Sequence, residues 1–253
     1  METAAITPAI DVAQVVLYIF WAFFAGLIYY LVRENHREGY PMDSGRENGP
    51  RISGWPVPDP VSYKMADGRV LLAPDVNRPD GSYSAEPSHA WIGAPLEPLG
   101  DPLLAGVGPG AWAQRADIPD MMSTPGELRI VPLRKHPDHG VAPQDVDPRG
   151  LPVFGKDGAV AGTVIDLWVD RSEILFRYLE VQLPDAHSVL LPVPFCRIKA
   201  SGVAVGALLA AQFAKVPVLR HPEQVTLLEE EKISAYFGAG LLYATADIQE
   251  PLF

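Results

Sequence analysis

A short stretch of the chain concentrates acidic and basic residues that could carry protons: Asp166, Asp170, Glu173, Arg177 and Glu180. On one face of a strand Asp166 and Asp170 would lie about 13 Å apart, at roughly 3.3 Å per residue, which is too far for a glycosidase pair. Crowded carboxylates raise one another's pKa toward neutrality, as successive proton carriers require, although Arg177 would oppose that rise. The pattern alone favours the alternative that these are ordinary solvent-facing acids.

A second candidate site is His136-Pro137-Asp138-His139, with two imidazoles and a carboxylate in four residues. It could bind a divalent metal loosely. However, Pro137 and Gly140 are typical of a turn, and structural zinc usually has four well-placed ligands. A surface turn is therefore the favoured interpretation.

No motif of a self-contained enzyme is present. The chain has no phosphate loop, no dinucleotide-binding glycine pattern, no hydrolase nucleophile elbow and no zinc-protease helix. The single cysteine, Cys196, has no histidine partner and is interpreted as a small buried hydrophobe rather than a reactive thiol. These motifs therefore give no indication of a self-contained enzyme, and we predict a non-catalytic protein.

The acidic residues must be positioned by the regular structure that begins near residue 151. GTVIDLWVD alternates as a strand and places Val164, Asp166, Trp168 and Asp170 on one face. ILFRYLEVQL, SVLLPV, CRIKA and GVAVGAL follow at short intervals, which predicts a small closed antiparallel sheet or barrel over residues 150–225.

The last element is predicted to be a helix over about residues 226–244. Thr226 is followed three positions later by Glu229, which is the pattern of a capping box. The acids that follow suit the positive end of a helix dipole. Gly238 and Gly240 leave the end of this helix uncertain.

An uncharged apolar segment covers residues 12–32 and is long enough, at about 30 Å of helix, to cross a bilayer. A cleavable signal peptide would need a basic start and a cleavage site, and the sequence offers neither. The first 32 residues contain no Lys or Arg, whereas Arg33 and Arg37 follow at once. The positive-inside rule therefore predicts a periplasmic N-terminus at 1–11 and a cytoplasmic bulk.

The segment 33–105 is rich in proline, with eleven prolines between residues 41 and 102. It is expected to be extended or irregular. A disordered tether is one interpretation, but side chains such as Tyr63, Leu71 and Trp91 are poor choices for a solvated linker. We favour a segment ordered against partner subunits, with residues 106–253 forming the cytoplasmic domain.

The overall charge narrows the possible partners. The chain has 31 acidic and 20 basic residues and a formal net charge of -11. Such a surface repels nucleic acid and gains nothing from anionic lipid headgroups.

Four extended segments, in order along nearly the whole chain, resemble the H subunit of the purple-bacterial photosynthetic reaction centre. They are FWAFFAGLIYYLVRENHREGYP at 20–41, GDPLLAGVGPGAW at 100–112, GTVIDLWVDRSE with RYLEV within 162–181, and QVTLLEEEKISAYFGAGLLYATA at 224–246. The resemblance implies one N-terminal transmembrane helix and a mainly β cytoplasmic domain with a PRC-type barrel and a C-terminal helix.

The resemblance also implies a role in the bacterial inner membrane. The chain would cap the cytoplasmic face of the L and M subunits, stabilise the complex and help conduct protons to the secondary quinone. The bacteriochlorophylls, bacteriopheophytins, quinones and non-haem iron would belong to L and M. The light-harvesting 1 ring, a cytochrome subunit and membrane lipids are further expected partners. A membrane-tethered PRC-barrel adaptor that transfers no protons is the alternative.

The resemblance implies a proton-transfer role for a set of residues in this chain. Asp170, Glu173 and Arg177 match positions near the quinone pocket, Asp166 and Glu230 match neighbouring polar positions, and Asp120 matches an acid toward the proton entrance. One departure concerns the histidine pair that family members carry after that acid, where this chain reads MMSTPG. Protons would enter instead by the His136 turn, or by carboxylates such as Asp120 and Glu127.

Overall fold

The computed structural model describes residues 5–7, 10–40, 42, 56–65, 68–75, 77, 83–91 and 93–248. Parts of the expected periplasmic N-terminus and of the proline-rich segment lie outside these residues. The chain divides into two compact units, one of residues 1–80 with 89–94 and one of residues 81–88 with 95–253. Each unit is described by itself.

The first unit contains the long helix α1, Val12–Asn35. Asp11 caps its N-terminus, because the Asp11 carboxylate accepts from the backbone N–H of Gln14. The helix is long and apolar enough to cross a membrane, and none of its residues is buried by the described part of the chain. A helix that is apolar all round and uncovered needs lipid or other helices around it.

Two small hairpins accompany α1: β1 (Ala5–Thr7) with β2 (Ile10–Asp11), and β3 (Val61–Lys64) with β4 (Val70–Ala73). Arg37, just beyond the helix, donates to the carbonyls of Asp59 and Ala73 at 2.9 and 3.1 Å and also pairs with Glu34. The basic residue that follows the apolar segment therefore also holds the chain on either side of the β3–β4 hairpin.

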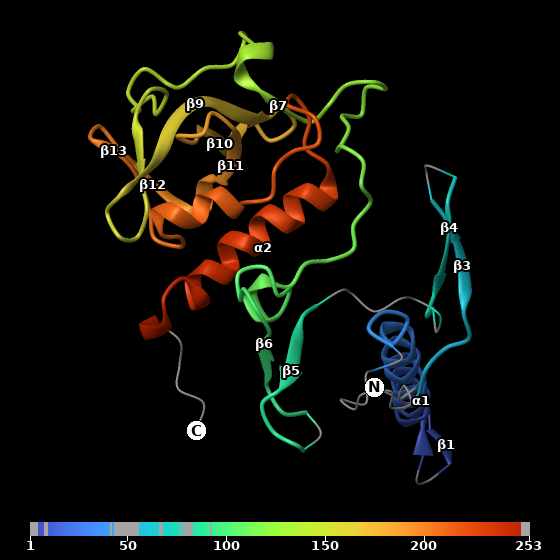
Figure 1. Cartoon of the computed structure of the whole chain (residues 1–253). Coiled ribbons are helices and arrows are strands. Elements are labelled where there is room, and N and C mark those ends of the chain that lie inside the picture. The colour runs from blue at the N-terminus through green and yellow to red at the C-terminus, as the bar shows by residue number, and fades with distance from the viewer. Residues whose placement is uncertain are drawn as a thin grey trace. The chain divides into compact units, whose positions relative to one another are not determined.

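The second unit is built on a seven-stranded sheet (Figure 1). Its strands follow the order β11-β10-β9-β8-β13-β12, and β7 also pairs with β9. The bounds are β7 Ile130–Pro132, β8 Pro152–Phe154, β9 Val160–Asp170, β10 Leu175–Gln182, β11 Ser188–Pro192, β12 Cys196–Lys199 and β13 Gly202–Val205. A separate pair joins β5 (Ala85–Pro87) to β6 (Leu96–Pro98).

Short helical turns connect these elements. They are η1 Gly108–Gly110, η2 Leu133–Lys135, η3 Val193–Phe195, η4 Ala210–Lys215 and η5 Ala246–Ile248. The predicted mainly β domain is confirmed, but the expectation of a closed antiparallel sheet is wrong in two respects. The end strands β11 and β12 are not paired in the described structure, and β13 runs parallel to β8.

Two register shifts interrupt the pairing of β9 with β10. Glu180 lies opposite Asp166 while Val181 lies opposite Val164, so Ile165 is an extra residue in β9. The strict alternation predicted for this strand is therefore wrong, because Val164 and Leu167 both lie in the hydrophobic core. The second shift makes Arg177 the extra residue in β10.

The C-terminal helix α2, Leu227–Tyr243, lies across one side of the sheet (Figure 1). The predicted capping box is confirmed, since the Thr226 hydroxyl accepts from the Glu229 N–H and the Glu229 carboxylate accepts from the Thr226 N–H. The helix continues through both glycines. A Cβ on Gly238 would lie 2.7 Å from the carbonyl oxygen of Pro109, and one on Gly240 would lie 2.3 Å from that of Ala207. Close packing, and not a helix end, accounts for these glycines.

Candidate functional site: carboxylates around two arginines

Four of the predicted site residues meet around one arginine that the sequence analysis did not single out. Arg129 donates from Nε to both carboxylate oxygens of Asp170 at 3.1 Å. Its Nη2 donates to Glu173 at 2.6 Å, and its Nη1 donates to Asp120 at 3.2 Å. Arg177 Nε lies 3.4 Å from Oδ2 of Asp170, outside hydrogen-bond geometry. We call these five residues the Arg129 cluster.

Strand pairing brings the cluster together. Ile130 in β7 lies opposite Asp170 at the end of β9, so the preceding residue, Arg129, reaches the turn between β9 and β10. The backbone N–H of Arg171 donates to the carbonyl of Arg129 and fixes this position. The extra residue in β10 is Arg177, and a bulge of this kind turns its side chain out of the regular alternation, here toward Asp170.

The Asp170 carboxylate is fully buried and strongly held. Burial alone would raise its pKa, but hydrogen bonds from Arg129 and from the backbone N–H groups of Glu173 and Ser172 outweigh it and lower the pKa below the ordinary value. The expected rise toward neutrality is therefore wrong for Asp170. This carboxylate stays ionised as a fixed negative charge.

Asp166 belongs to a different group. Arg134 Nη1 donates to Asp166 at 2.8 Å and to Glu180 at 2.6 Å, and the backbone N–H of Arg134 also reaches Asp166. The indole N–H of Trp168 completes the group by donating to Glu180 at 2.9 Å. Asp166 and Glu180 are 5% and 7% exposed. We call this the Arg134 cluster, and it divides the single row of carriers expected from the sequence into two arginine-centred groups.

Glu230 lies in the first turn of α2 and accepts a hydrogen bond from the Tyr178 hydroxyl at 2.7 Å. Burial raises its pKa, and the hydrogen bond from Tyr178 and the positive charges of Arg177 and Arg115 only partly oppose this rise. Glu230 is thus a carboxyl group that holds a proton more readily than an ordinary glutamate does. It is a candidate proton carrier on the helix side of β10.

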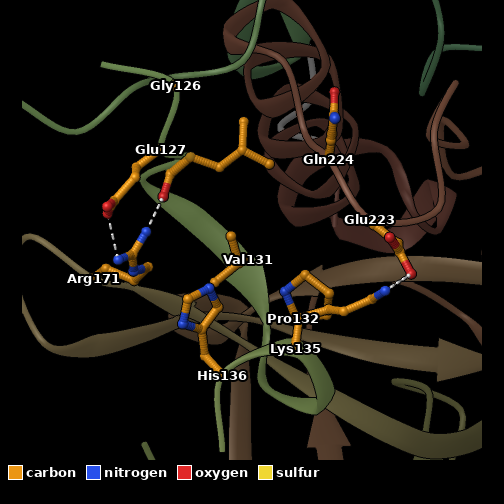
Figure 2. A pocket seen from close by; sticks show the side chains of 10 residues that line it. Gly126, Glu127, Val131, Pro132, Lys135, His136, Arg171, Glu223 and Gln224 are labelled. Atoms are coloured by element: carbon orange, nitrogen blue, oxygen red, sulfur yellow. Dashed lines mark hydrogen bonds and ion pairs between the residues drawn. The ribbon is translucent and has the colours of Figure 1, made fainter. Parts of the chain in front are cut away.

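The two histidines of the predicted turn face different hollows. The backbone N–H of His139 donates to the carbonyl of His136, so the favoured turn is confirmed. His136 lines a pocket of about 440 Å³ with Arg171, Glu127 and Lys135 (Figure 2). There burial and the charge of Arg171 lower the pKa of His136. His139 instead lines a pocket beside Asp166 and Glu180.

Metal ligation has no support in the described part of the chain, where no group of three or more His, Cys, Asp or Glu side chains could hold an ion. The Cys196 thiol is half-buried and donates to the carbonyl of Val193. Burial raises the pKa of this thiol to about 11, so the thiolate needed for reactivity is scarce at neutral pH.

Sequence reasoning missed the two arginines at the centres of both clusters. Arg129 and Arg134 flank the four apolar residues 130–133, a segment too short to stand out as a strand. Charge balance was the available signal, because buried carboxylates require counter-charges and Arg177 alone could not serve all of them.

Two family models match the chain. The first describes the photosynthetic reaction centre, H-chain N-terminal region, and matches residues 4–135, more than half of the sequence. The chain belongs to the photosynthetic reaction centre H-chain family. The second model is the PRC-barrel domain, which matches residues 144–206 and covers the strands from β8 to β13. Family membership and the apolar helix α1 together indicate a membrane-associated reaction-centre subunit.

The two matched regions of this H-chain family member meet in the clusters. Asp120 and Arg129 come from the H-chain region, whereas Asp170, Glu173 and Arg177 come from the PRC-barrel region. A PRC barrel without the preceding region would lack the central arginine. The Arg129 cluster is thus built from residues of both matched regions.

Proposed function

We propose that this chain caps the cytoplasmic face of the L and M subunits, stabilises the complex and helps conduct protons to the secondary quinone. Its N-terminus would lie in the periplasm, α1 would cross the bacterial inner membrane, and the second unit would lie in the cytoplasm. The positive charges of Arg33 and Arg37 directly after the apolar segment support this orientation. The pigments, quinones and iron would be held by L and M.

The observation that carries the proposal is the Arg129 cluster. It places Asp120 and Glu173, with 34% and 50% of their side chains exposed, on two branches of one guanidinium group. Both carboxylates are accessible to water or to a neighbouring subunit, while Asp170 stays ionised between two arginines. Glu173 would be the carrier, and Asp170 would fix the position and charge of Arg129.

Docking would complete the proton-carrying environment. A subunit placed over Glu173 would exclude bulk water from its carboxylate, so proton exchange would run through the groups that border Glu173 in the complex. Glu230, whose pKa burial already raises, offers a second protonated group on the α2 side. Asp166 lies in the separate Arg134 cluster and would contribute through its charge.

The test is the Glu173→Gln variant in the assembled complex. Flash kinetics should show the proton-coupled second electron transfer to quinone slowed by about tenfold or more, because glutamine cannot carry the proton. Glu223→Gln is a matched control, since Glu223 is similarly exposed and pairs with Lys135 outside the cluster. A normal rate in Glu173→Gln would show that Glu173 is not a carrier.

A second candidate function is a membrane-tethered PRC-barrel adaptor that transfers no protons. The lowered pKa of Asp170 favours it, because a carboxylate fixed between arginines can serve as a structural cross-link alone. Purification from native membranes distinguishes the two. Co-isolation with pigment-binding subunits that absorb in the near infrared supports the reaction-centre role, and a colourless preparation supports the adaptor.

A further inference from the structure

The turn between β9 and β10 holds a bulky side chain in an unfavourable backbone conformation. Ile174 has a φ of 55°, in the left-handed region that suits glycine or asparagine. A β-branched residue there is a clear outlier, and such outliers gather at functional sites. Ile174 is also 76% exposed, more than any other large hydrophobic residue in the described part of the chain.

The turn is rigid, so Ile174 is held in a fixed position. The N–H of Ile174 donates to the carbonyl of Asp170 at 2.8 Å, and the Asp170 carboxylate accepts from two further N–H groups of the turn. Arg171 locks the base of the turn by donating to the Leu128 carbonyl and to Glu127 at 3.0 and 2.7 Å (Figure 2). A preorganised apolar tip loses little entropy when it binds.

The surroundings of Ile174 indicate what it would bind. Leu175, the next residue, is 41% exposed and extends the apolar surface. The adjoining Arg129 cluster has three carboxylates and two guanidinium groups, so its formal net charge is one negative unit. A matching partner surface would have an apolar pocket with hydrogen-bond donors or a positive charge at its rim.

We propose that Ile174 is an apolar anchor that inserts into a donor-rimmed pocket on the cytoplasmic surface of the membrane-embedded reaction-centre subunits. This inference rests on the proposed capping function. Ile174 directly follows Glu173, which must face the partner to deliver a proton, so the two side chains would meet the same partner surface. Within the described part of the chain the side chain of Ile174 is left exposed, and burial in the complex would offset this exposure.

The experiment titrates the full-length chain in detergent against pigment-binding subunits from which this chain has been removed. Ile174→Asn removes the apolar group and suits a left-handed backbone. It should weaken binding by about tenfold or more, as expected for a buried apolar anchor. The thermal unfolding midpoint of the unbound variant should rise by a few degrees, on the order expected for relieved backbone strain.

Two control variants separate strain from docking. Ala186, in the turn between β10 and β11, is the other described non-glycine residue with a positive φ, at 71°, and it is exposed. Ala186→Asn should raise the unfolding midpoint without changing the affinity. Ile174→Leu keeps an apolar side chain and should bind within about threefold of the unaltered chain.

The outcomes distinguish this inference from the proposed function. If the unaltered chain binds and Ile174→Asn binds equally well, the anchor is wrong while the capping function stands. A lower unfolding midpoint for Ile174→Asn would also overturn the anchor, because Ile174 would then be stabilising its own fold. If the unaltered chain fails to bind the pigment-binding subunits, both are overturned.

Discussion

Two carboxyl groups near β10 have pKa values that are shifted in opposite directions. Asp170 is fully buried, yet Arg129 and two backbone N–H groups keep its pKa low. Glu230 receives one neutral hydrogen bond from Tyr178, and burial prevails and raises its pKa. The number and charge of the donors decide which group holds a proton and which remains a fixed charge.

The lowered pKa of Asp170 predicts a pH-dependent contribution to stability. Because the folded-state pKa of Asp170 lies below the ordinary 3.8, the ionised carboxylate stabilises the fold above pH 3.8. This contribution is lost as the pH falls through the folded-state pKa. Asp170→Asn should therefore lower the free energy of unfolding by about 2 kcal/mol at pH 7, with a smaller difference near pH 3. Chemical denaturation of the full chain in detergent at both pH values measures it.

The control for this variant is Asp185→Asn. Asp185 forms an exposed pair with His187, so its substitution should change the free energy of unfolding by less than about 0.5 kcal/mol. An Asp170→Asn variant as stable as the unaltered chain at pH 7 would contradict the view of Asp170 as a stabilising counter-charge.

The sequence predicted which charged residues form the candidate site, because Asp170, Glu173 and Arg177 are close along the chain and share one hairpin. It could not predict their partner. Arg129 lies 41 residues before Asp170, and only the pairing of β7 with β9 brings the two together. Contacts at such separation depend on strand order and register, which no local pattern specifies.

At the level of elements, regular patterns were predicted well and interruptions were not. The strands β9 and β10 and the capped start of α2 follow from alternation and from Thr226 with Glu229. The extra residues Ile165 and Arg177 have no sequence signal, because any residue type can occupy a bulge. The predicted closed sheet likewise depended on long-range pairing.

Helix α2 offers a test of close packing. A Cβ on Gly240 would lie 2.3 Å from the backbone carbonyl oxygen of Ala207, a contact that no rotamer change can relieve. Gly240→Ala should lower the free energy of unfolding by a net 1–2 kcal/mol, roughly the overpacking cost less the gain in helix propensity. Thermal unfolding followed by circular dichroism measures the loss.

Gly206→Ala is the matched control, because nothing lies within 4 Å of its Cβ position and its φ is not positive. Its effect should stay within about 0.5 kcal/mol. Equal stability of the two variants would show that α2 tolerates a larger separation from the loop at Ala207.

At the scale of the whole molecule, no residue of α1 is buried by the described part of the chain. Aromatic rings lie along it, with Phe20 and Phe24 stacked at 5.7 Å and Trp21 edge-on to both. Gly26 leaves open space for close approach by another helix. A helix with this surface is suited to specific neighbours as well as to lipid.

Replacing residues 12–32 with polyleucine tests this view. The replacement is long and apolar enough to span the bilayer, but it lacks the rings and the glycine that specific helix packing uses. The yield of intact pigmented complex should fall roughly several-fold. Immunoblotting of the membrane fraction controls for insertion, and a normal yield at an equal membrane level would show that α1 is a simple tether.

The position of Arg129 has a consequence for how such a chain can be divided. The two matched family regions are separated by residues 136–143, which makes that loop an obvious place to cut. A cut there would separate β7 from β9 and would leave the Asp170 carboxylate without Arg129, its main counter-charge. The region that the PRC-barrel model matches is therefore smaller than the paired sheet, because β7 joins β9 from outside that region.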